Sequence, residues 1–271
     1  MNDKYLLYTG ALRVFNDFSQ STCENFNIEH DINNPKFEEL RNQYPVIEIA
    51  GEGNDLSKAT NIMRWIYDNI LHCGGATNFN LILKDPFSIL NYSFGKDWEN
   101  GGVYCGHQAI VFVECCRSVG LSAWVINGLP FSPHDFDNHV LAMVYINELA
   151  KWVLFDQSNN AYFTDKNGVA LSPLEARYLF GIDEICVSEE LQPFHKVHFI
   201  EKVESYKEYM AKNLFYIKFW TMNTLEFDLA GNETYYLIPL GFNVKEREIA
   251  LEWFKGGKIH IVSQEQFVRI K

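Results

Sequence analysis

Cys105 has the sequence surroundings of a nucleophilic thiol. Gly101 and Gly102 precede it, and a largely apolar run between Gly106 and Val119 follows it. A run that is apolar nearly all round at helical spacing predicts a buried helix, with Cys105 at its start. Backbone N–H groups at a helix N-terminus favour a thiolate, and they also stabilise the oxyanion that forms when a thiolate attacks a carbonyl carbon. Cys105 is therefore the candidate nucleophile.

A nucleophile of this kind needs a base and a group that orients the base. His107 is excluded as the base, because it lies two residues along the helix and is turned about 200° away from Cys105. The next two segments are better candidates, since His139 starts HVLAMVYI and Asp156 ends KWVLFD. Both segments have the composition of β-strands, and turn residues separate them. His139 and Asp156 are therefore the candidate base and orienting acid.

The two segments are expected to form a hairpin that turns at Asn147 and Glu148, which places His139 directly opposite Asp156. The same register pairs apolar residues on the same face, Leu141 with Leu154 and Met143 with Trp152. A carboxylate opposite an imidazole accepts a hydrogen bond from one ring nitrogen and stabilises the imidazolium that forms when the other nitrogen takes the thiol proton. The spacing thus predicts a Cys, His, Asp triad.

The remaining pattern predicts the elements that hold these residues. Helices are expected at 34–44, 57–72, 85–92 and 172–181, with a long helical stretch at about 200–220 and another helix near 244–254. Further strands are expected at 122–126, 224–228, 234–240 and 258–262. If a domain boundary exists, it lies near 190–200, which divides the chain into a core at 1–195 and an α/β extension at 196–271. The extension and the core are also compatible with one domain.

Composition limits the partners of the protein. The 271 residues include 35 Asp and Glu against 23 Lys and Arg, and the formal net charge is -12. Such a surface repels phosphate backbones and anionic lipids, so we expect neither nucleic acid nor membranes as partners. The N-terminal residues lack the basic head and apolar stretch of a secretory signal, which predicts a cytoplasmic location.

Cysteine spacing argues against metal and disulfide frameworks. The six cysteines are spread irregularly, with no CxxC pair. Cys115 and Cys116 are interpreted as core residues of the buried helix. The loop 132–138 contains His134, Asp135 and Asp137, which match no calcium-binding pattern, so the loop is expected to border the site beside His139. We predict no metal and no cofactor.

The same residues resemble the transglutaminase-like superfamily, papain-like enzymes with a Cys, His, Asp triad in that chain order. The resemblance spans roughly 57–160 and rests on WIYDNI, YCGHQA, CRSVGLSAW, NHV and WVLFD. It implies an α+β fold in which a buried nucleophile helix packs on an antiparallel sheet. It also implies Cys105 as nucleophile, His139 as base and Asp156 as orienting acid. The chain departs from many members after the acid, where Gln157 and Ser158 replace a proline and a threonine.

The resemblance leaves the reaction open. We expect a cysteine enzyme that acts on peptide or amide bonds through a thioester, with a peptide or protein substrate and with hydrolysis favoured over crosslinking. Trp98 or Asn100 could supply a second oxyanion donor from a side chain. An arylamine N-acetyltransferase has the same triad order, but two residues rather than one separate Gly102 from Cys105. A binding protein that keeps the triad only as structure is a further alternative.

Overall fold

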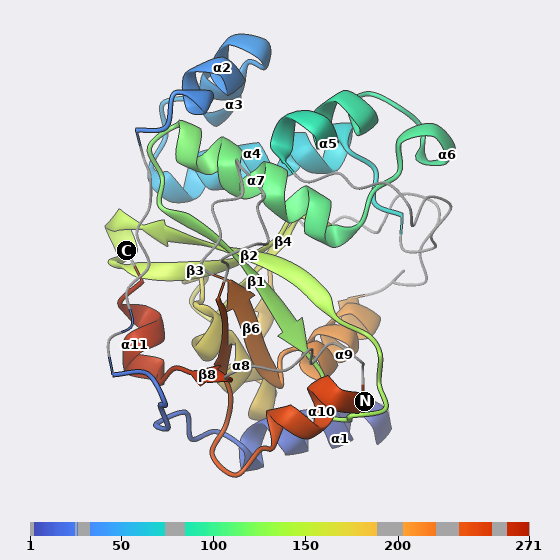
Figure 1. Cartoon of the computed structure of the whole chain (residues 1–271), viewed down its shortest axis with the longest axis vertical. Coiled ribbons are helices and arrows are strands. Elements are labelled where there is room, and N and C mark those ends of the chain that lie inside the picture. The colour runs from blue at the N-terminus through green and yellow to red at the C-terminus, as the bar shows by residue number, and fades with distance from the viewer. Residues whose placement is uncertain are drawn as a thin grey trace.

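The protein is built around one mixed sheet with helices on both of its faces (Figure 1). This architecture comes from a computed structural model that describes residues 3–24, 26, 33–73, 85–188, 203–220, 233–250 and 259–270, without the side chains of Trp98 and Ala250. Helices and strands alternate irregularly along the chain, so the expected α+β class is confirmed.

The described residues form an eight-stranded sheet in the order β5-β4-β3-β2-β1-β6-β7-β8. Its strands are β1 (Ala123–Leu129), β2 (His139–Ile146), β3 (Lys151–Asp156), β4 (Ala161–Thr164), β5 (Cys186–Val187), β6 (Tyr216–Trp220), β7 (Thr234–Leu237) and β8 (His260–Ile261). Neighbouring strands are antiparallel except for β7 and β8, which are parallel. The strands that carry His139 and Asp156 therefore lie well inside the sheet.

One helical layer covers the face of the sheet that contains Ala142 and Val144. It consists of α2 (Lys36–Gln43), α3 (Val46–Ala50), α4 (Asp55–Asn69), α5 (Pro86–Ser93), α6 (Trp98–Gly101) and α7 (Cys105–Ser118). Helix α7 is buried on nearly all sides, as its sequence predicts. Asp85 and Pro86 begin α5, and Asp85 accepts a hydrogen bond from the Ser88 backbone, as expected of an N-cap.

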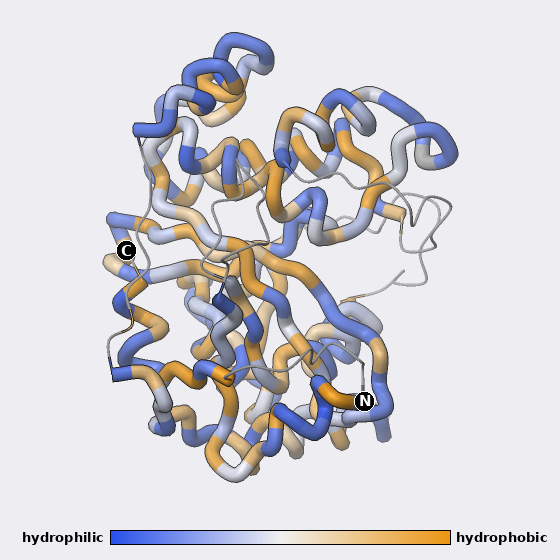
Figure 2. Tube along the Cα trace, viewed as in Figure 1, coloured by the Kyte–Doolittle hydropathy of each residue, from blue (hydrophilic) through white to orange (hydrophobic). Residues whose placement is uncertain are grey.

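The second helical layer covers the opposite face, which contains Leu141 and Met143. It consists of α1 (Asp3–Val14), α8 (Pro173–Gly181), α9 (Val203–Asn213), α10 (Val244–Ala250) and α11 (Gln264–Val268). Hydrophobic residues run along the central strands between the two layers (Figure 2). The sheet is thus buried on both faces, which explains why its strands are apolar almost throughout.

The β2–β3 hairpin has a different register from the predicted one. Met143 pairs with Leu154 and Tyr145 pairs with Trp152, so each partner is displaced by two residues. The prediction was wrong because the connection has four residues instead of two: a 3-10 turn at Asn147–Leu149, then Ala150 in the left-handed region at φ 50°. A displacement of two residues leaves every side chain on its predicted face. His139 and Asp156 are therefore diagonal neighbours instead of direct partners.

The stretch expected to be helical to residue 220 contains a helix and a strand. Helix α9 ends at Asn213, and β6 follows and pairs with β1, antiparallel. The long-helix prediction was wrong because residues 216–219 are all buried, so their apolar pattern shows neither the strand period nor the helix period clearly. The expected strand at 224–228 and the boundary at 190–200 lie outside the described residues. The division at residue 195 stays a prediction, although β6, β7 and β8 extend the same sheet as the core strands.

Within the described ranges, no helix has the length and apolar character needed to cross a membrane.

Candidate active site

Cys105 is the first residue of α7 and is partly exposed. Its Sγ accepts a hydrogen bond from the Val140 backbone N–H at 3.5 Å, which joins the helix start to β2. The side-chain amide of Gln157 donates to the carbonyl oxygens of Cys105 and Val140, at 3.1 Å each. Ser158 donates from Oγ to the Gln108 side chain at 2.7 Å. Gln157 and Ser158 thus tie α7 to the end of β3.

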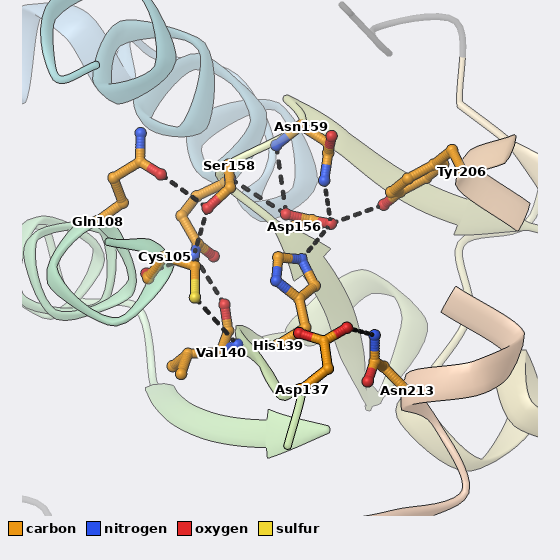
Figure 3. Close-up of polar contacts among 11 residues, drawn as sticks. Cys105, Gln108, Asp137, His139, Val140, Asp156, Ser158, Asn159, Tyr206 and Asn213 are labelled. Carbon is orange, nitrogen blue, oxygen red and sulfur yellow. Dashed lines mark hydrogen bonds and ion pairs between the residues drawn. The ribbon is translucent and has the colours of Figure 1, made fainter. Parts of the chain in front are cut away.

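His139 lies between Cys105 and Asp156 (Figure 3). Its Nε2 lies 2.7 Å from Asp156 Oδ2, and the imidazole is 2% exposed. Burial alone would lower the pKa of His139, but the negative charge of Asp156 and the hydrogen bond to it raise that pKa to about 10, with a smaller contribution from the Cys105 side chain. With Nε2 engaged by Asp156, Nδ1 is the ring nitrogen left for Cys105. The imidazole is therefore positively charged at neutral pH.

The Asp156 carboxylate is fully buried and accepts hydrogen bonds from five groups within the described part of the chain. Oδ2 accepts from His139 Nε2, from Asn159 Nδ2 at 2.7 Å and from Tyr206 OH at 2.9 Å. Oδ1 accepts from the backbone N–H groups of Ser158 and Asn159, at 3.1 and 3.2 Å. Burial alone would raise the pKa of Asp156, but the charge of His139 and these hydrogen bonds hold it below its ordinary value. Asp156 thus stays ionised and fixed in orientation.

Helix α9 contributes side chains that sequence reasoning missed. Tyr206 is fully buried, and its ring stacks on Phe163 with centroids 5.7 Å apart, while its hydroxyl reaches Asp156. Tyr209 lies one turn further along, and its ring meets the His139 ring edge to face at 5.2 Å. Three-residue spacing puts both tyrosines on one face of the helix. That spacing was the available signal, but nothing local in the sequence shows what the face contacts.

The loop before His139 is held by ion pairs to α9. Lys212 Nζ lies 2.6 Å from Asp137 Oδ2 and 3.2 Å from Asp135 Oδ2. The Asn213 amide donates to Asp137 Oδ2 at 3.2 Å, and Arg247 donates to the Asp135 backbone carbonyl at 2.8 Å. The acidic residues of this loop are therefore paired with basic and amide groups next to His139. Among the described residues, no group of three His, Cys, Asp or Glu side chains could hold a metal ion.

The other singled-out cysteines and His107 lie in the core or pack beside it. Cys115 and Cys116 are fully buried, as predicted, and burial raises the pKa of both thiols. His107 accepts a hydrogen bond from the Tyr104 backbone N–H at Nδ1, so its ring caps the start of α7. The helix expected at 57–72 is shorter at its C-terminus, since α4 ends at Asn69 and His72 forms a bridge with Val103.

The two proposed side-chain oxyanion donors receive no support from the described geometry. The Asn100 amide donates to both Asp97 oxygens, at 2.8 and 3.0 Å, so it is directed at its own helix. The side chain of Trp98 lies outside the described residues. Backbone N–H groups at the start of α7 remain as candidate oxyanion donors, because the first N–H groups of a helix have no intrahelical partner.

Comparison with known proteins identifies the segment that carries the three residues. Residues 46–157 match the family model of the Transglutaminase-like superfamily. This segment is transglutaminase-like. It begins at α3 and ends directly after Asp156, so Cys105, His139 and Asp156 all lie inside it, while Tyr206 and Tyr209 lie outside it.

The chain is also similar to a solved structure. A crystal structure described as a "Putative Cysteine Protease from Cytophaga hutchinsonii" is similar at 19% sequence identity and a TM-score of 0.34, over 69% of this chain. The present chain spans 52% of that protein, about half its length. No curated protein matches the chain. The transglutaminase-like assignment of residues 46–157 therefore rests on the family match.

Proposed function

We propose that the protein is a cysteine enzyme that cleaves peptide or amide bonds, with Cys105 as nucleophile, His139 as general base and acid, and Asp156 as the positioning acid. The observation that carries the proposal is the placement of His139, which has Nε2 on the Asp156 carboxylate at 2.7 Å and the Cys105 side chain on its other side. In the binding alternative, nothing requires the imidazole to contact the cysteine. The contact therefore favours catalysis.

The proposed reaction begins from the charges on His139 and Cys105. A positively charged imidazole beside Sγ stabilises the thiolate, which attacks the carbonyl carbon of the substrate. A C–S bond forms, and the negative charge that develops on the carbonyl oxygen is stabilised by N–H groups at the start of α7. The C–N bond then breaks, and the imidazolium proton passes to the leaving amine. This step leaves a thioester on Cys105 and a neutral His139.

Water completes the cycle. Neutral His139 takes a proton from a water molecule, whose oxygen attacks the thioester carbon. The C–S bond then breaks, which releases a carboxylic acid and restores the Cys105 thiolate beside the His139 imidazolium. Hydrolysis is favoured over crosslinking because Cys105 is partly exposed, so water reaches the thioester as readily as an amine does. Transfer of an acyl group to an amine is the alternative outcome of the same intermediate.

The mechanism is tested by alkylation with iodoacetamide at pH 7, with the rate for each cysteine measured by peptide mass spectrometry. Cys186 is exposed and serves as a reference thiol within the same molecule. We expect Cys105 to react roughly tenfold faster than Cys186, because most of an ordinary thiol is protonated at this pH. We also expect His139→Ala to remove the difference. Equal rates for both cysteines, or a fast Cys105 in the variant, would contradict the mechanism.

The choice between hydrolysis and transfer needs a second experiment. A peptide mixture is incubated with the enzyme in ¹⁸O-labelled water, with and without a primary amine. Hydrolysis puts ¹⁸O into new carboxyl groups, whereas transfer gives amides of the added amine. The Cys105→Ala variant is the matched control and should give neither product.

A further inference from the structure

The Asp156 carboxylate accepts a hydrogen bond from a residue outside the transglutaminase-like segment. Tyr206 donates its hydroxyl proton to Asp156 Oδ2 at 2.9 Å, and its ring is buried and stacked on Phe163. Asp156 Oδ2 is the same oxygen that receives His139 Nε2. A rotation of the carboxylate about its Cβ–Cγ bond would break both hydrogen bonds together. The two contacts therefore share one carboxylate orientation.

The contact is part of a larger attachment between α9 and the site. Tyr209 packs its ring on the imidazole of His139. Lys212 and Asn213 hold Asp137, two residues before His139. Contacts of α9 thus reach the acid, the base and the loop that leads into the base, and Figure 3 shows two of them, Tyr206 at Asp156 and Asn213 at Asp137.

We propose that Tyr206 is a positioning residue, which fixes the Asp156 carboxylate in the orientation that receives His139 and so makes α9 an integral part of the active site. This inference rests on the proposed function and extends it to residues beyond the family match. It implies that residues 46–157 alone do not form the complete catalytic arrangement.

Tyr206→Phe tests the inference in the full chain, because phenylalanine keeps the ring that stacks on Phe163 and removes only the hydroxyl. A hydrogen bond to a charged group is stronger than one between neutral groups, so its loss should change the fraction of molecules in the reactive geometry roughly tenfold. We expect Cys105 in this variant to react with iodoacetamide about tenfold more slowly at pH 7. We also expect the pKa of Asp156 to rise, because the ionised carboxylate loses a hydrogen-bond donor.

Tyr5→Phe is the matched control. Tyr5 OH donates to Asp183 Oδ1 at 2.7 Å, so this variant also removes a tyrosine–carboxylate hydrogen bond, but one between α1 and the residues after α8. We expect Tyr5→Phe to lower the melting temperature without changing the alkylation rate of Cys105 or the pKa of Asp156. A merely structural role for Tyr206 would give the same result in both variants and would overturn the inference.

A second measurement separates this inference from the proposed function. The Nε2 proton of His139 is followed by NMR in protein labelled with ¹⁵N-histidine, which requires no catalysis. We expect Tyr206→Phe to exchange this proton with water about tenfold faster than the wild type and Tyr5→Phe. Unchanged exchange would overturn the positioning role, whether or not Cys105 is reactive. Faster exchange together with an unreactive wild-type Cys105 would support the role and contradict the enzyme.

Discussion

The buried ion pair between His139 and Asp156 gives the stability of the protein a defined dependence on pH. The pKa of His139 is about 10 in the folded protein, against 6.5 for an ordinary histidine. A raised folded pKa means that the folded state holds a proton that the unfolded state releases between these two values. The stabilisation is therefore complete below pH 6.5 and is lost as pH rises to about 10.

The magnitude follows from the same interval. Each pH unit corresponds to about 1.4 kcal/mol, so the free energy of unfolding should fall by about 5 kcal/mol between pH 6.5 and 10 from this group. Asp156→Asn removes the charge and keeps the size of the side chain. Burial then dominates, so the pKa of His139 should fall below 6.5 and the loss of stability at alkaline pH should disappear.

The assay is urea unfolding at pH 6, 7, 8 and 9, with Asp156→Asn compared with its parent. Both proteins carry Cys105→Ala, so that exchange of a proton between the thiol and His139 does not contribute. Cys115 and Cys116 remain in both, and their raised pKa values cancel in the difference. We expect the parent, but not the variant, to lose about 1.4 kcal/mol per pH unit above pH 7 from this pair. Parallel curves for the two proteins would refute the assignment of the charge to His139.

Two further predictions concern how the site is held. Gly128→Ala should destabilise the protein and slow the alkylation of Cys105, because an added Cβ would lie 2.5 Å from the Asn213 carbonyl oxygen at the end of α9. The melting temperature measures the first effect, and the rate of reaction with iodoacetamide measures the second. Arg117→Met should lower the free energy of unfolding by about 3–5 kcal/mol in urea titrations, because it removes the guanidinium that lies 2.8 Å from the fully buried Glu114 carboxylate. Addition of Glu114→Gln should restore part of that loss, and a loss under about 1 kcal/mol for Arg117→Met alone would contradict this account.

The sequence predicts those parts of the site that depend on the local periodicity of apolar residues. The helix that begins at Cys105 and the strands that begin at His139 and end at Asp156 have their predicted bounds, because each apolar run ends at a polar or glycine residue. Side-chain alternation is sufficient to put His139 and Asp156 on one face. It does not determine the pairing partner, which depends on the conformation of Ala150, and alanine gives no signal for a left-handed turn.

The contribution of α9 could not be predicted for a different reason. Tyr206 is 50 residues from Asp156 in sequence, and the hydrogen bond between them depends on how β6 and α9 pack against the core strands. Tyrosines at helical spacing are typical of many buried helix faces, so their pattern predicts burial but not a partner. The error at 216–220 has another origin, because a strand buried along most of its length loses the alternation that distinguishes it from a helix.

The four-residue connection between β2 and β3 limits how this hairpin can vary in length. Surface loops usually tolerate insertions and deletions. Here, an odd change in length that altered the register would turn Asp156 to the opposite face of the sheet, away from His139 and Tyr206. An even change would keep the face but move Asp156 along its strand by about 7 Å per two residues, beyond the reach of a 2.7 Å hydrogen bond. The connection, although exposed and far from Cys105 in sequence, therefore tolerates only those changes in length that leave the register of the hairpin unchanged.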